Sequence, residues 1–170
     1  VVFTSSIAVF GAPFYDKIAD EFHLTPLTSY GTQKAIGELL LADYARRGFF
    51  DGIGIRLPTI CVRPGTPNKA ASGFFSNIIR EPLAGLESVC PVGPEVSHPV
   101  TSPQRTVDGL IAVYEASRDA FQGRSALNLP ALNVSVAQML DALQAVAGPA
   151  VRARVRFERG ACAWEVIDFA

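Results

Sequence analysis

The feature that most restricts the fold is an alternation of short apolar segments with helical patterns along the 170 residues. Apolar segments at 1–4, 53–57 and 126–129 have the length and composition of buried strands. Between them, 30–47 and 106–118 carry apolar residues at helical spacing, with Thr28 or Ser29 able to cap the first helix. This order of elements is typical of an α/β domain.

The chain from Arg63 to about residue 104 has a different composition, which is rich in Gly, Pro, Ser and Asn. Such loop-rich segments often form binding pockets. We also expect two further helices and two weak strands, at 73–82, 135–147, 88–92 and 152–157.

Charge and composition exclude several classes of function. The 15 basic and 16 acidic residues give a net charge of -1, and no basic run marks a surface for nucleic acid or membrane. Cys61, Cys90 and Cys162 form no C-x-x-C pair, a usage that suits reduced thiols in the cytoplasm. His23 and His98 are the only histidines, so we expect no metal site.

Tyr30 and Lys34 are the strongest candidates for chemistry. Residues four apart project from one helix face, so the ammonium can lie beside the phenol. A phenol free in water ionises near pH ~10, and bringing it to neutrality takes on the order of 4 kcal/mol, which one cation about 4 Å away can supply. Ser6, at the end of the first apolar segment, can hydrogen-bond the same substrate hydroxyl. The three residues predict the oxidation of an alcohol.

In this order, Ser6, Tyr30 and Lys34 resemble the Ser-Tyr-x-x-x-Lys set of the short-chain dehydrogenase/reductase superfamily, in its extended branch of NAD-dependent epimerases and dehydratases. A Tyr-x-x-x-Lys pattern alone also occurs in many helices where the Tyr packs and the Lys is solvated. The sequence Val9-Phe10-Gly11 supports the resemblance, and counting back from it favours Ser6 over the neighbouring Ser5.

A narrower resemblance involves the segment 63–85 and Ser102-Pro-Gln-Arg105, which are similar to the D-erythronate dehydrogenase group. These enzymes oxidise a four-carbon sugar acid. The likeness extends over residues 1 to about 150.

The resemblance implies the C-terminal part of a Rossmann-like parallel sheet domain at 1–65 and 105–132. A small substrate-binding lobe would comprise 66–104 and 133–170. The family's Gly-x-x-Gly-x-x-Gly turn has no match in the chain. We therefore expect a C-terminal piece of a longer enzyme, inactive when isolated.

The resemblance also implies the ligand contacts. Tyr30, Lys34, Pro58, Thr59 and Ile60 would contact the cofactor. That cofactor is expected to be NAD, with NADP not excluded because the selecting residue precedes this segment in the family.

For the substrate, the candidates besides Ser6 and Tyr30 are Asn68, Ser72 and Arg105, with Arg80 a weaker one. Arg105 can bind a carboxylate through two parallel hydrogen bonds, and its alternative is a solvated residue at a helix start.

The function expected is NAD-dependent oxidation of a hydroxyl of a small sugar acid. A nucleoside-diphosphate-sugar epimerase or dehydratase with the same residues is the alternative, slightly disfavoured because Phe10 replaces the tyrosine common there. A non-catalytic fragment is the third hypothesis. The expected partners are the sugar acid and, at most, a second copy of the chain in a homodimer, in the cytoplasm, without nucleic acid or membrane.

Overall fold

The computed structural model describes residues 1–12, 18–66 and 72–158, which form two compact units. The first contains Val1–Pro58 and Gln104–Ala131, and the second contains Thr59–Pro103 and the described residues from Leu132 onward. The boundary was expected after residue 65, and the two units divide after Pro58. The chain leaves the first unit after Pro58, because the strand that begins at Thr59 pairs within the second unit.

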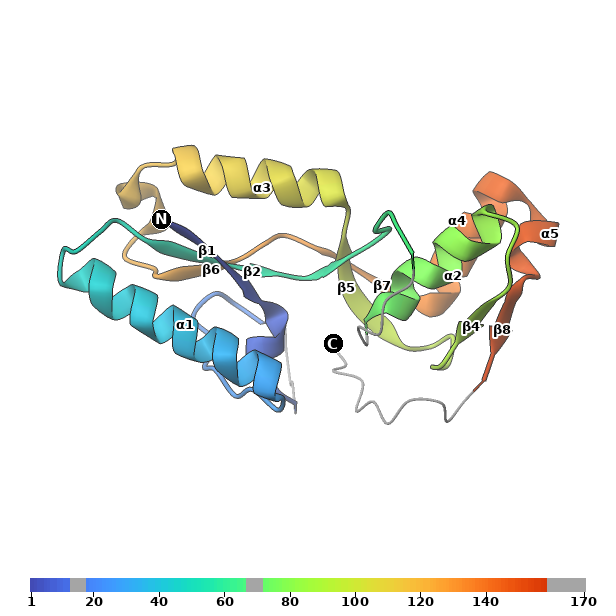
Figure 1. Ribbon diagram of the computed structural model, residues 1–170, viewed down its shortest axis with the longest axis horizontal. Helices are drawn as coiled ribbons and strands as arrows, with labels where there is room; N and C mark the ends of the chain where they lie inside the picture. The colour runs from blue at the N-terminus through green and yellow to red at the C-terminus, as the bar shows by residue number, and fades with distance from the viewer. Residues whose placement is uncertain (13–17, 67–71, 159–170) are drawn as a thin grey trace. The chain divides into compact units, whose positions relative to one another are not determined.

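The first unit is built on a parallel sheet (Figure 1). Its strands are β1 (Val2–Ser6), β2 (Ile53–Leu57) and β6 (Ala126–Asn128), in the order β1-β2-β6. Helices α1 (Ser29–Arg46) and α3 (Pro103–Glu115) lie on opposite faces of this sheet. The predicted α/β class with a Rossmann-like parallel sheet is confirmed.

The first strand differs from the expected buried segment at residues 1–4. It continues to Ser6, and within it only Ser5 is buried. The reason is its place in the sheet, since among the described residues β1 pairs with β2 alone. A single 3₁₀ turn, η1 (Ile7–Val9), follows directly.

Helix α1 begins after Thr28, whose hydroxyl accepts the Gly31 backbone N–H at 3.0 Å. It packs through a face that includes small residues, because a side chain at Gly31 would overlap the carbonyl oxygen of Ala8. The apolar residues whose helical spacing predicted this helix do not form its packed face. Their side chains are 46–65% exposed: Ile36, Leu39, Leu40 and Tyr44.

The second unit contains a mixed sheet that sequence patterns did not predict. Strands β3 (Thr59–Ile60) and β5 (Ser97–Thr101) pair in parallel, and β7 (Leu132–Ser135) pairs antiparallel to β5. Proline at position 99 and the shortness of β3 hide these strands from a sequence reading.

Two helices and a two-stranded sheet complete the second unit. Helix α4 (Val136–Ala147) starts with a capping box between Ser135 and Gln138, and its apolar face packs on that of α2 (Gly73–Leu83). The other elements are β4 (Ser88–Cys90), α5 (Pro149–Arg152) and β8 (Val155–Phe157), with η2 (Arg118–Phe121) in the first unit. None of the described helices has the length and apolar character needed to cross a membrane.

Candidate active site

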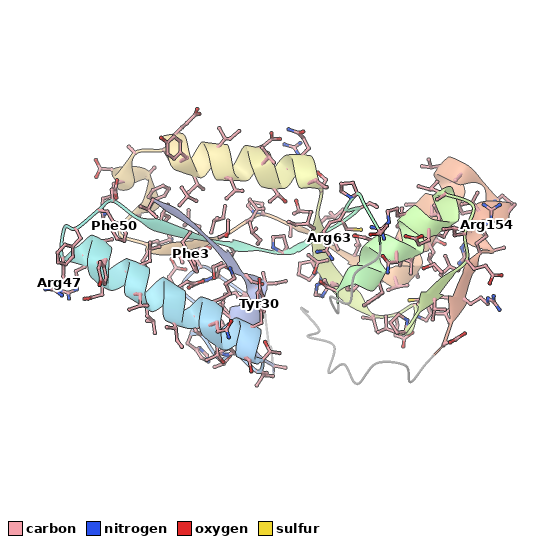
Figure 2. All side chains as sticks on the ribbon, viewed as in Figure 1. Phe3, Tyr30, Arg47, Phe50, Arg63 and Arg154 are labelled. Carbon is pink, nitrogen blue, oxygen red and sulfur yellow. The ribbon has the colours of Figure 1, made fainter. Side chains whose placement is uncertain are left out.

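The predicted pair on α1 is held against β1 by a backbone contact. The Lys34 ammonium donates a hydrogen bond to the carbonyl oxygen of Thr4 at 2.7 Å. Its nitrogen lies 5.7 Å from the centre of the Tyr30 ring and 5.2 Å from that of Phe3. Figure 2 labels these two aromatic residues. The structure therefore brings Lys34 beside the Tyr30 ring and to the middle of β1.

Tyr30 is accessible from outside. It lies in the first turn of α1 and is 54% exposed. A phenol in this position can reach a ligand, whereas a packed core tyrosine could not.

The two serines at the end of β1 have different environments. Ser5 is buried, and its hydroxyl donates to the Glu38 carboxylate at 2.5 Å. Ser6 is half-buried, and its oxygen accepts the Ala8 N–H at 3.2 Å as the cap of η1. Successive side chains of a strand point to opposite faces, so the two hydroxyls diverge. Ser6 is therefore the better candidate, since the hydroxyl of Ser5 is committed to a buried carboxylate.

The predicted cofactor residues after β2 fall in both units. Pro58 is buried at the end of the first unit, and Thr59 and Ile60 form β3 in the second. The Thr59 hydroxyl shares a 2.7 Å hydrogen bond with His98 Nε2. Any cofactor contact of Thr59 would thus rely mainly on its backbone.

The predicted substrate residues are also dispersed. Arg105 is exposed in the first turn of α3, on the opposite face of the sheet from α1. Ser72 precedes α2 in the second unit and is half-buried. Asn68 lies outside the described residues.

Arg80, the weaker substrate candidate, is bonded within the second unit. Its guanidinium donates to the Arg63 carbonyl oxygen and to Asn77 Oδ1, each at 2.7 Å, and pairs with Glu81. These contacts fix α2 to the preceding loop.

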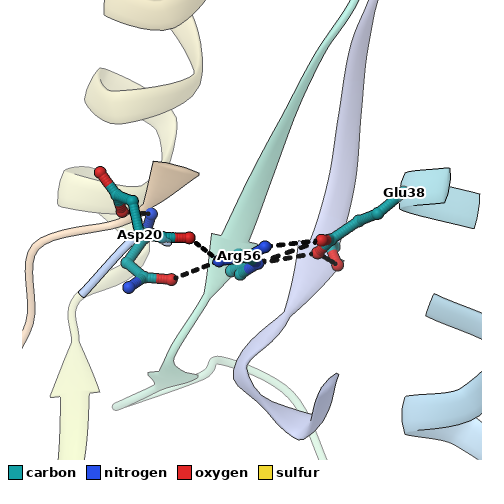
Figure 3. Close-up of polar contacts among 5 residues, drawn as sticks. Asp20, Glu38 and Arg56 are labelled. Carbon is teal, nitrogen blue, oxygen red and sulfur yellow. Dashed lines mark hydrogen bonds and ion pairs between the residues drawn. The ribbon is translucent and has the colours of Figure 1, made fainter. Parts of the chain in front are cut away.

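A buried charged cluster next to the pair on α1 was not predicted. Arg56, 5% exposed, forms three hydrogen bonds of 2.8–3.2 Å with the carboxylate of Glu38, which is 4% exposed (Figure 3). On its other side Arg56 donates to the Asp20 carbonyl oxygen at 2.8 Å. An arginine in the middle of an apolar strand was the available signal, because arginine is rarely buried without a partner.

Burial shifts three titratable groups in the second unit. It lowers the pKa of His98 to about 4, so the ring, stacked on Phe75 with 4.6 Å between centroids, is neutral at pH 7. It raises the pKa of the Cys61 and Cys90 thiols, which makes them poor nucleophiles. Among the described residues, no three His, Cys, Asp or Glu side chains are grouped so as to hold a metal ion.

Comparison with known proteins gives the family. Residues 1–101 match the model of the NAD dependent epimerase/dehydratase family. The chain belongs to this family. Its relatives include proteins named D-erythronate dehydrogenase from Cupriavidus necator, 52% identical over 161 residues, and from Haemophilus influenzae, 46% identical over 157 residues. The alignments cover 95% and 92% of this chain, and the chain spans about half the length of these curated relatives, 50% in each case.

Two solved structures have a similar fold. A crystal structure described as the nucleoside-diphosphate-sugar epimerase from Agrobacterium tumefaciens is 58% identical, with a TM-score of 0.89 over 94% of this chain and 46% of that one. The L-threonine dehydrogenase of Phytophthora infestans is 21% identical and matches with a TM-score of 0.83 over 93% of this chain and 50% of that one. At this identity the match shows a similar fold and nothing about function.

The residues present fit one end of a nicotinamide cofactor. The exposed Tyr30 phenol and the Lys34 ammonium offer hydrogen-bonding groups at the carboxyl end of β1, where open α/β sheets bind ligands. A Gly-rich turn for the pyrophosphate has no counterpart within residues 1–170.

Proposed function

We propose that the full-length protein is an NAD-dependent oxidoreductase that oxidises a hydroxyl of a small sugar acid of the D-erythronate type. The observation that carries this proposal is the Lys34 ammonium held beside Tyr30 by the Thr4 carbonyl oxygen, with Ser6 two residues further along the same strand. The names of the two curated relatives support the substrate class.

In the proposed mechanism, Tyr30 removes the proton of the substrate hydroxyl. The Lys34 charge stabilises the phenolate that this requires, and Ser6 hydrogen-bonds the same substrate oxygen and orients the carbon. The nicotinamide, when bound, supplies the acceptor for the hydride.

The remaining contacts are extensions of the same proposal. Lys34, Tyr30 and the backbone of Pro58, Thr59 and Ile60 would hold the nicotinamide end of NAD, with NADP as the alternative. Asn68, Ser72 and Arg105 remain substrate candidates. A cytoplasmic location and a homodimer also remain predictions, and the exposed apolar side chains of α1 would suit the homodimer.

Residues 1–170 alone should bind neither NAD nor NADP and turn over no substrate, because the phosphate-binding turn is not among them. Titration of the purified fragment against NADH, followed by cofactor fluorescence, tests this. Saturable binding at about micromolar cofactor by a monodisperse sample would contradict it.

A nucleoside-diphosphate-sugar epimerase is the second candidate, favoured by the description of the 58% identical structure. An epimerase returns its hydride to the sugar, so it accumulates no NADH. The test therefore incubates the full-length protein with NAD and either D-erythronate or UDP-glucose. Formation of one NADH per D-erythronate oxidised supports the dehydrogenase. Epimerisation of UDP-glucose without accumulation of NADH would show instead that the protein is an epimerase.

A further inference from the structure

We propose that Glu38 is a positioning residue for the reaction: its buried carboxylate fixes the end of β1, and hence Ser6, relative to Tyr30 and Lys34. This proposal rests on the proposed function. Glu38 itself is buried, and its carboxylate binds Ser5 and Arg56, neither of which is a reacting group assigned above.

Glu38 joins the catalytic helix to the catalytic strand. Its Oε1 accepts the Ser5 hydroxyl at 2.5 Å, one residue before Ser6. Lys34, one turn earlier on α1, binds the carbonyl oxygen of Thr4. Two successive turns of α1 thus hold two successive residues of β1, which sets both the distance and the register between helix and strand.

Arg56 holds the carboxylate in this place. Its Nε and Nη2 reach both oxygens of Glu38, so the carboxylate plane is fixed as well as its position. Ser5, Arg56 and Asn128 are direct neighbours across β1, β2 and β6, and Arg56 Nη1 also lies 3.4 Å from Asn128 Oδ1. The row spans the whole sheet of the first unit as described.

Arg56 is in turn held from the loop that leads into α1. It donates to the Asp20 carbonyl oxygen, and the Asp20 carboxylate accepts the Asn128 backbone N–H at 2.6 Å. The Phe10 ring, just after η1, lies 5.0 Å from the guanidinium carbon. The cluster therefore connects the segments on both sides of Ser6 to the strand next to it.

Stability alone is a weak reason for such a cluster. Replacing a buried ion pair by well-packed apolar residues is often neutral or stabilising, so a carboxylate here indicates a need for a defined geometry. Orientation of reacting groups is a large part of catalysis, and a displacement of about 1 Å can cost about 100-fold in rate.

The test compares Ser5→Ala, Glu38→Gln and the double variant in the full-length protein, with D-erythronate and its analogue deuterated at the oxidised carbon. Asp43→Asn is the matched control, since it changes an exposed carboxylate on the same helix. Activities are normalised to folded protein, measured by circular dichroism. Ser5→Ala keeps the ion pair and so remains informative if Glu38→Gln fails to fold.

We expect kcat to fall about 10-fold in Ser5→Ala and at least as far in Glu38→Gln, with a larger primary deuterium isotope effect and unchanged NAD affinity. The double variant should be no slower than the slower single variant, because both changes break one link. A purely structural role lowers the amount of folded enzyme and leaves the isotope effect unchanged.

The outcomes separate the two proposals. If both single variants have the kcat and the isotope effect of the wild-type enzyme, the positioning role is overturned and the proposed function stands. A wild-type protein that oxidises no sugar acid overturns the proposed function and the positioning role together.

Discussion

The Lys34 ammonium donates a 2.7 Å hydrogen bond to the carbonyl oxygen of Thr4, although the two residues are thirty positions apart. This contact fixes the charge at Thr4, two residues before the end of β1, with the Tyr30 ring beside it. The carbonyl oxygen thus holds the Lys34 ammonium in one position, whereas the ammonium of a fully solvated lysine would be mobile. The position of this charge is the basis of the proposed chemistry.

Replacing Lys34 by Met keeps the length of the side chain and removes its charge. In the full-length protein we expect turnover to fall by about 10² to 10⁴, the usual contribution of general acid–base catalysis, because the proposed base loses its neighbouring cation. Steady-state assays with D-erythronate and NAD measure it. Arg46→Met, an exposed cation on the same helix, is the control and should retain wild-type turnover.

Arg105 is expected to bind the carboxylate of the substrate. Arg105→Lys should weaken sugar-acid binding by about 1 to 3 kcal/mol, since a lysine cannot form two parallel hydrogen bonds, and leave NAD affinity unchanged. The KM for D-erythronate and the Kd for NAD are compared with those of Arg118→Lys, an exposed arginine of the same unit paired with Asp51. An unchanged KM and kcat for D-erythronate in Arg105→Lys would show that Arg105 is a solvated surface residue with no role in substrate binding.

His98 should make the stability of the second unit depend on pH. Its pKa is about 4 in the fold and 6.5 when free, so between these values the unfolded chain binds a proton that the folded chain does not. Stability is therefore fully present above pH 6.5 and is lost as the pH falls toward 4. From pH 7 to 5 the loss is up to about 2 kcal/mol.

Urea unfolding at pH 7 and pH 5 checks this, with His98→Gln and the exposed His23→Gln as a matched pair. The difference in the free energy of unfolding between pH 7 and pH 5 should be smaller in His98→Gln than in wild type, and unchanged in His23→Gln. An equal difference in wild type and both variants would exclude His98 as its source.

Sequence patterns predicted the elements whose signals are local. Strand β2 was expected at Ile53–Leu57 and is found there, because five consecutive residues are buried or nearly so between clear turn signals. The helix expected at 135–147 is found at Val136–Ala147, where Ser135 caps it through a capping box. Strands β5 and β7 were missed because their pairing depends on residues more than thirty positions apart.

The candidate site was predicted only in part for the same reason. Tyr30 and Lys34 are four residues apart on one helix, so their proximity follows from helical geometry. The link from Glu38 to Ser5 and Arg56 joins a helix to two strands, and no local pattern specifies it. Similarly, apolar periodicity predicted α1 but not its packed face, where a side chain at position 31 would overlap the carbonyl oxygen of Ala8.

The most direct test of the proposed base is single-turnover oxidation of D-erythronate by the full-length Tyr30→Phe variant with bound NAD. We predict that the rate of NADH formation falls by at least about 100-fold while the Kd for NAD stays within about twofold of wild type, because the ring remains and only the proton acceptor is lost. A Tyr30→Phe enzyme that keeps more than about a tenth of the wild-type rate would contradict the assignment of Tyr30 as the base.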